Sequence, residues 1–237
     1  MSSPKRLARI AGVLYLLNGI FAGFAFGYVI AKVYMPNAAA TTAANVAANS
    51  GLVRVGVVAD LVQATIWVFL ALALYDLLKH VHEGAARAMF VLVAVGAAIV
   101  SLNDVFQFES VRVATAPSYA TALGAAGSNA LVLLLLDLHH YGFLIAQIFF
   151  GLWLVPLGYL AHKSGMFPTA LGVLLVAGGA CYLVGMLAVF LVPDHGEGIN
   201  VAVTIPSAVA EIAMVLYLLV VGVKAVKPDG GSERTLS

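Results

Sequence analysis

Charge and cysteine are both scarce in this sequence of 237 residues. Asp, Glu, Lys and Arg together make up 10% of it, whereas soluble domains carry about 25%. Hydrophobic residues make up 62%, and the mean hydropathy is +1.03. A soluble globular domain does not have this balance, but a multi-pass membrane protein does.

The same scarcity excludes several classes of partner and site. The formal net charge is +1, and no basic run alternates with aromatic residues, so we expect no nucleic acid partner. Cys181 is the only cysteine and lies in an apolar stretch, which excludes a disulfide framework and a thiolate metal cluster. The N-terminus begins like a signal peptide, but its apolar stretch is too long and lacks an A-x-A cleavage site. We therefore expect it to be retained as a first helix.

Six segments are long and apolar enough to cross a bilayer core about 30 Å thick, which takes about 20 helical residues. They are residues 10–31, 52–78, 86–113, 138–161, 168–192 and 199–223. None shows the alternation of a β-strand, and lipid does not tolerate irregular backbone. The sequence therefore predicts an all-α, polytopic integral membrane protein with six transmembrane helices. We expect one domain over residues 1–228 and a short flexible tail at 229–237.

The distribution of Lys and Arg among the short connections predicts the orientation. Nine of these residues fall on one side: Lys5, Arg6, Arg9, Lys79, Arg87, Lys163, Lys224, Lys227 and Arg234. Only Lys32, Arg54 and Arg112 fall on the other side, where the last connection, PDHGEG, is acidic. Both termini should therefore be cytoplasmic.

Two connections and two groups of glycines carry further predictions. We expect residues 35–51 to extend the second helix outward as an exposed amphipathic turn. A continuous helix over 129–161 would be about 50 Å long, so residues 131–136 are expected to lie along the outer interface or to cover the outer end of the bundle. Small residues let helices approach closely and can mediate a homo-oligomer. We expect this packing role for the following glycines: Gly19, Gly23, Gly27, Gly172, Gly178, Gly179 and Gly185.

Polar side chains interrupt the apolar spans. A charge inside a span costs about 2.5–3.5 kcal/mol on insertion scales and usually faces a cavity or a partner. The interruptions include Asn18, Asp60, Gln63, Asn103, Asp104, Gln107, Glu109, Asp137, His139, His140, Tyr141, Gln147 and Glu211. Counted along the predicted helices, most of them lie in the outer half, and Glu211 lies deepest, near the midplane. They predict a polar cavity that opens to the outside and is closed toward the cytoplasm.

The stretch DLHHYG, residues 137–142, is the densest of these interruptions. Asp137 can cap a helix, with the histidines at the headgroups. Alternatively, the histidines can act with the buried acids as ligands or as a proton relay. Helical spacing places His140 on one face with Asp137 and Tyr141, and directs His139 elsewhere.

Two main classes of function fit these residues, and the sequence leaves open whether the chain is an enzyme. In the first, the cavity binds and transports a small cation, proton or polar solute. In the alternative, a divalent metal such as zinc activates water to hydrolyse a lipid-like substrate, with Asp137, His139 and His140 as candidate ligands. A third class is an accessory membrane protein whose polar residues only specify helix packing. The candidate binding residues are Asp60, Asp104, Asp137, His139, His140, Tyr141 and Glu211.

Four stretches carry a family resemblance: RLARIAGVLYLLNGI, RVGVVADLVQATIWVFLALALYDLLK, the region from LLDLHHYGFLIAQ to GGACYLV, and AEIAMVLYLLVVGVK. Together they resemble a bacterial membrane family catalogued as domain of unknown function 4386. The resemblance implies a multi-pass protein of the bacterial plasma membrane with six helices. It also implies recurrent positions at Asp60, Asp137, His139, Tyr141 and Glu211, which favours His139 over His140. At Gly185, the resemblance leads us to expect an acid in relatives.

Overall fold

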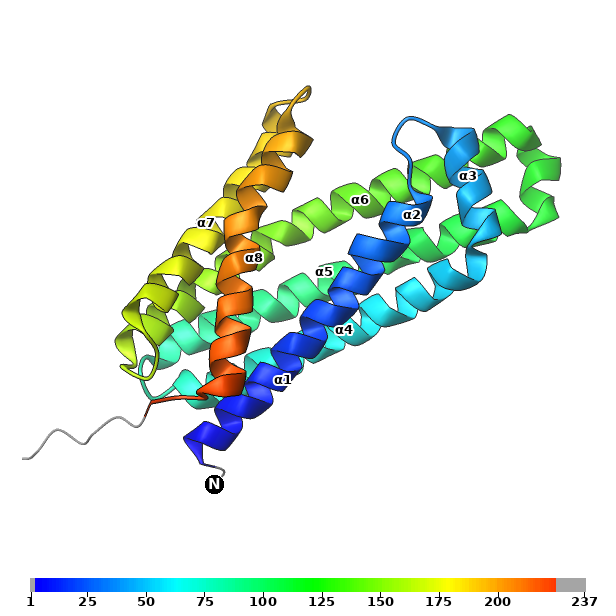
Figure 1. The fold of residues 1–237 in the computed structure, drawn as a ribbon. Coiled ribbons are helices and arrows are strands. Elements are labelled where there is room, and N and C mark those ends of the chain that lie inside the picture. The colour runs from blue at the N-terminus through cyan, green and yellow to red at the C-terminus, as the bar shows by residue number, and fades with distance from the viewer. Residues whose placement is uncertain (1–2, 225–237) are drawn as a thin grey trace, which may run out of the picture.

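The computed structural model describes residues 3–224, and these residues form helices without a strand (Figure 1). The first span consists of α1 (Pro4–Ala22), the π-helix η1 (Gly23–Ile30) and α2 (Ala31–Val33). The other elements are α3 (Ala39–Ala48), α4 (Ser50–Leu78), α5 (Glu83–Thr115), α6 (Pro117–Lys163), α7 (Thr169–Leu191) and α8 (Gly196–Val220). Six of the described helices are long and apolar enough to cross a membrane. The predicted six-helix, all-α membrane fold is therefore confirmed.

Both ends of the described chain lie at the same end of the bundle. A side chain added at Gly222, just after α8, would meet Lys5 in α1. The connections from α4 to α5 and from α6 to α7 reach the same end in Figure 1. We call it the basic end, because Lys5, Arg6, Lys79, Arg87 and Lys163 all lie there. The predicted tail at 229–237 lies outside the described residues.

Two predictions about the connections are wrong. Residues 131–136 do not lie along an interface, because α6 is helical from Pro117 to Lys163, with one non-helical residue at Gly124. Residues 39–48 do not extend the second helix but form α3, whose Thr42, Ala43 and Val46 are buried. The reason is the same in both places, since α3 packs against the extended ends of α5 and α6 and gives their apolar residues a partner.

The glycines divide into two groups that the sequence did not distinguish. A Cβ at Gly151 or Gly179 would lie 2.6 Å from the other residue's carbonyl oxygen, so α6 and α7 touch through their backbones. Gly158 and Gly172 form a second such pair between the same helices. A Cβ at Gly19, Gly23 or Gly27 would meet nothing within 4 Å. The prediction that these three pack helices within the chain is therefore wrong.

Apolar packing is concentrated toward the basic end. A large cluster there joins α1, α4, α5, α6, α7 and α8 around Leu70, Leu74, Trp153, Leu157 and Met214. A smaller cluster at the opposite end joins the end of the first span, α3 and the outer parts of α4, α5 and α6. Between the two clusters lie most of the buried polar side chains, including Asp60, Asn103, Asp104, His139 and Gln147. The fold thus isolates a polar layer between two apolar ones.

Candidate metal centre and membrane cavity

Three helices each contribute one metal-ligating side chain to a single buried cluster. Asp60 comes from α4, Asp104 from α5 and His139 from α6. One ligand atom from each lies within 4.8 Å of the other two, and His139 Nε2 is 4.0 Å from Asp104 Oδ1. Each residue is at most 3% exposed. We call these three residues the Asp–Asp–His cluster.

The cluster is short of hydrogen-bond partners. Both carboxylate oxygens of Asp104 and both ring nitrogens of His139 are buried and have no hydrogen-bond partner among residues 3–224. Buried polar atoms in folded proteins are normally paired, and an unpaired one costs about 1–3 kcal/mol. A cation bound at the cluster would take an Asp104 oxygen and one ring nitrogen of His139 as ligands, because carboxylate oxygens and imidazole nitrogens are common ligands of divalent metals.

Neighbouring groups fix the position of His139. Asn103 Nδ2 donates a hydrogen bond of 2.6 Å to the main-chain oxygen of His139. Gly142, one turn further along α6, leaves room for Asn103, since a Cβ at position 142 would overlap Asn103 Oδ1. Phe26 from η1 stacks on the imidazole, with the ring centroids 5.3 Å apart. The histidine is therefore held both by its backbone and by its ring.

Three other candidate residues lie elsewhere. Asp137 Oδ1 accepts a hydrogen bond of 2.6 Å from the Tyr34 hydroxyl, and burial followed by this hydrogen bond raises the pKa of Tyr34. His140 Nε2 lies 2.8 Å from Glu197 Oε1, at the start of α8. Tyr141 is 47% exposed and contacts the rings of His140 and Phe190.

These positions correct two interpretations of DLHHYG. Asp137 does not cap a helix, because α6 begins twenty residues earlier, at Pro117. The predicted grouping of His140 with Asp137 and Tyr141 is confirmed, because Tyr34 contacts both His140 and Asp137 and the His140 ring contacts Tyr141. This face is not the buried one, since His139 is 1% exposed and the His140 side chain is 25% exposed. Among the described residues, the three side chains close enough to share an ion are Asp60, Asp104 and His139, not Asp137, His139 and His140. The face of α6 that turns inward is set by its packing on α5.

Glu211 belongs to a second polar group. Its two carboxylate oxygens accept hydrogen bonds of 2.8 Å from the Tyr15 hydroxyl and 2.9 Å from the Tyr182 hydroxyl. The three residues come from α8, α1 and α7. No Lys, Arg or His is among their hydrogen-bond partners in the described part of the chain. This carboxylate is stabilised by hydroxyl donors rather than by a counter-charge.

A cavity of about 420 Å³ connects the two polar groups. Asp60 and Glu211 both line it, together with Asn18 and Gln63, which are joined by a hydrogen bond of 2.8 Å. Counted from the basic ends of their helices at 1.5 Å per residue, Glu211 lies about 14 Å in, Gln63 about 22 Å and Asp60 about 27 Å. These side chains form a polar line along the cavity wall, from Glu211 toward the Asp–Asp–His cluster.

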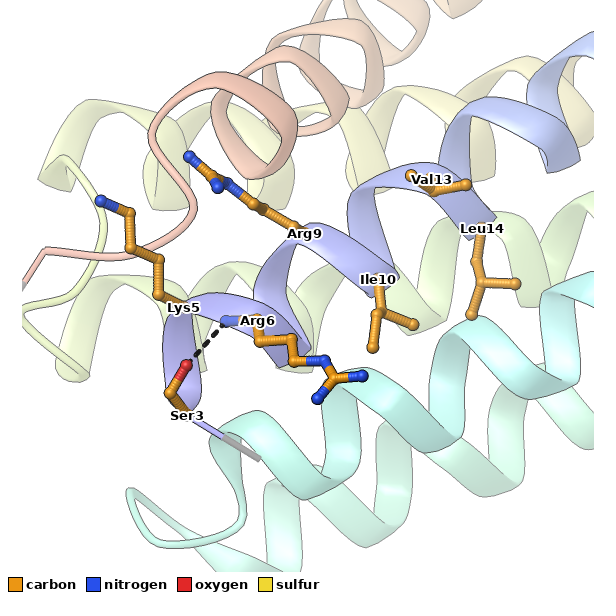
Figure 2. A pocket seen from close by; sticks show the side chains of 7 residues that line it. All are labelled: Ser3, Lys5, Arg6, Arg9, Ile10, Val13 and Leu14. Atoms are coloured by element: carbon orange, nitrogen blue, oxygen red, sulfur yellow. Dashed lines mark hydrogen bonds between the residues drawn. The ribbon is translucent and has the colours of Figure 1, made fainter. Parts of the chain in front are cut away.

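A second hollow, of about 470 Å³, lies on the surface of α1. Figure 2 shows Lys5, Arg6 and Arg9 around it, with the Ser3 hydroxyl accepting a hydrogen bond from the Arg6 main-chain N–H. Its charged residues are exposed or partly exposed. Basic side chains next to a membrane span are generally attracted to anionic lipid headgroups.

A family model described as "Domain of unknown function (DUF4386)" matches residues 10–222. The chain belongs to this family. No curated protein and no solved structure matches the chain. Membership of the DUF4386 family agrees with the resemblance found in the sequence, but it assigns no activity to the residues of either polar group.

Sequence reasoning missed the partners of the candidate residues. Three tyrosines were not among the candidate residues, whereas Tyr15 and Tyr182 donate hydrogen bonds to Glu211 and Tyr34 donates one to Asp137. A tyrosine in an apolar helix gives no pattern that distinguishes these roles. Phe26 was missed for the same reason, although the neighbouring GxxxG spacing could have drawn attention to its helix.

Proposed function

We propose that the chain binds a divalent metal cation inside the membrane, with Asp60, Asp104 and His139 as its ligands. The observation that carries the proposal is the set of four orphaned ligand atoms on two buried side chains, Asp104 and His139. A third ligand, Asp60, lies within reach on another helix. Two negative carboxylates buried this close together are costly unless a positive charge compensates them.

The donor set favours zinc or a similar ion. One nitrogen and two carboxylate oxygens suit zinc, whose ligands lie about 2.0–2.2 Å from the metal. Two ligands on one tetrahedral ion are then about 3.3 Å apart, so the observed 4.0 Å between His139 and Asp104 closes with a small side-chain movement. Three protein ligands leave a coordination position open for water.

Elemental analysis of the detergent-purified protein, prepared without a His-tag, tests the metal proposal. We expect about one divalent ion per chain, and we expect H139A and D104N to lose it. The matched control is H140A, because the neighbouring histidine pairs with Glu197 instead. Loss of metal in H140A, or equal metal content in H139A and the unmodified chain, would contradict this ligand set.

We further propose that a small cation or a proton moves along the polar wall between this centre and Glu211. The polar line from Asp60 through Gln63 and Asn18 to Glu211 supports this role, because transported ions need successive polar groups at membrane depth. We expect E211Q to abolish proton or cation flux into proteoliposomes. The control is E109Q, since Glu109 forms only a local ion pair with Arg112. Intact flux in E211Q would rule out this route.

A second candidate is a metal-dependent hydrolase acting on a lipid-like substrate. It is supported by the open coordination position and by Asp60, which belongs to both the cluster and the cavity wall. A bound ion would supply an activated water, and Asp60 and Asp104 would hold that ion. This candidate predicts conversion of a component of a lipid extract that is lost with a chelator and in H139A, as followed by mass spectrometry of the lipids.

A further inference from the structure

The cavity opens sideways, between α1 and α8. These helices contact each other near the basic end and diverge away from it (Figure 1). Gly19 and Gly23 on one side of the opening and Ala208 and Ile212 on the other line the cavity and are also exposed. All four lie in membrane-spanning segments, so the opening faces the lipid.

The glycines at this opening do not serve helix contact inside the chain. A Cβ at Gly19 or Gly23 would meet nothing within 4 Å. Glycine is costly inside a helix, by about 1 kcal/mol relative to alanine, so its presence usually has a reason. At these two positions the missing side chains leave the opening free.

The cavity wall is mostly apolar and aromatic, with one carboxylate at each end of its polar line. Phe143, Phe150, Trp67 and Trp153 line it, and the polar line defined above ends at Glu211. Its lining includes two carboxylates and no Lys, Arg or His. Carboxylates and aromatic rings together favour a cationic head group, through hydrogen bonds and cation–π contact.

We propose that this cavity binds a cationic amphiphile with a single alkyl chain, taken from the bilayer through the opening between α1 and α8. The ammonium head group lies at Glu211 and the adjoining part of the alkyl chain lies against the aromatic wall. A volume of about 420 Å³ lies within the range of ligand pockets, roughly 300–1,000 Å³. The proposal does not require a bound metal, because Asp104 and His139 do not line the cavity.

The two tryptophans of the chain provide a direct reporter. Both line the cavity, and each is only 2% exposed, so bulk lipid does not reach them. A bromine atom on an alkyl chain quenches tryptophan fluorescence on contact. We would titrate the full chain in nanodiscs with an alkylamine brominated near its head group, and with the alkyl sulfate brominated at the same carbon.

We expect saturable quenching by the amine and not by the sulfate. E211Q should weaken amine binding by about tenfold or more, because a charge-assisted hydrogen bond is lost. G23L should abolish quenching by filling the opening. The matched control is G27L, four residues further along the same span, because a Cβ there also meets nothing within 4 Å and Gly27 does not line the cavity.

Three outcomes would overturn the proposal: equal quenching by amine and sulfate, quenching that survives in G23L, or equal loss in G23L and G27L. If the last outcome came with a change of oligomeric state, the exposed glycines of the first span would form an interface between two copies of the chain. The D104N variant separates this proposal from the metal centre. It should lose the metal but keep amine quenching, so either proposal can fail alone.

Discussion

At the scale of single residues, the Asp–Asp–His cluster is the most demanding feature of the protein. A charged group in a membrane segment costs free energy, and the carboxylate of Asp104 has no hydrogen-bond donor among the described residues. By contrast, Glu211 has two hydroxyl donors, and Asp137 has one. Asp104, Glu211 and Asp137 all lie in predominantly apolar stretches of the sequence, but their carboxylates differ in the number of hydrogen-bond donors that contact them. Of these three acids, Asp104 is the one whose carboxylate has no hydrogen-bond donor among the described residues.

Gly142 gives a prediction at the residue scale. It has no side chain, and this leaves the room in which Asn103 holds the backbone of His139. In G142A the new methyl group overlaps Asn103 Oδ1 and displaces the hydrogen bond to the His139 carbonyl. We expect a loss of about 1–3 kcal/mol in unfolding free energy and a reduced metal content. Thermal unfolding and elemental analysis of the same preparation measure both. G51A is the control, since a Cβ at Gly51 meets nothing within 4 Å. Unchanged metal content in G142A would show that Asn103 does not position the histidine.

At the scale of elements, the first span stands apart from the others. Its second half contains the π-helix Gly23–Ile30, a rare conformation that often occurs at functional sites. This segment carries Phe26 onto the ring of His139 and also into the cavity wall. Phe26 thus lies between the cavity and the metal centre. Helices α6 and α7, in contrast, are joined tightly through paired glycines.

These contacts predict opposite effects for two glycine-to-alanine changes. In G179A the added Cβ comes 2.6 Å from the Gly151 carbonyl oxygen, so α6 and α7 must move apart. We expect G179A to lower the unfolding free energy by about 1–3 kcal/mol. G19A, in an open stretch of α1, should be neutral or stabilising by up to about 1 kcal/mol. Chemical or thermal unfolding in one detergent compares them. Similar values for the two variants would mean that the close approach of α6 and α7 is not needed for stability.

At the scale of the whole molecule, the bundle is closed at one end and divided at the other. The large apolar cluster seals the basic end, while α8 and α1 separate above it (Figure 1). Access to the polar layer therefore comes from the lipid or from the end opposite the basic one. Association with a second copy through the exposed glycines of the first span stays a prediction.

The distribution of basic residues gives a prediction for the whole molecule. Cytoplasmic connections are enriched in Lys and Arg, so the basic end should face the cytoplasm. With Cys181 replaced by alanine, a cysteine placed at Ser3 should react with an impermeant maleimide only after cells are lysed. A cysteine at Asp194, between α7 and α8, should react in intact cells. The reverse labelling pattern would show that the basic end faces outward and that the cavity opens toward the inside.

The sequence predicted the helices better than the connections between them. The six spans follow from apolar length alone, and their limits shift by only a few residues except in α6. The position of residues 131–136 was predicted wrongly because a membrane-spanning helix does not have to end where the bilayer core ends. The structure extends α6 beyond that length, since α3 and α5 cover its apolar side. A span length by itself does not contain this information.

The sequence by itself determined that the chain crosses a membrane six times, that its ends lie together and that polar residues occupy its spans. These properties depend on the hydrophobicity and order of residues along each helix, which are local. The family resemblance favoured His139 over His140, but only the tertiary structure showed that His139 meets Asp60 and Asp104 and that Glu211 meets two tyrosines. Adjacent helical residues point about 100° apart, so a rotation of α6 by about that angle would exchange the two histidines. Packing against neighbouring helices sets that rotation.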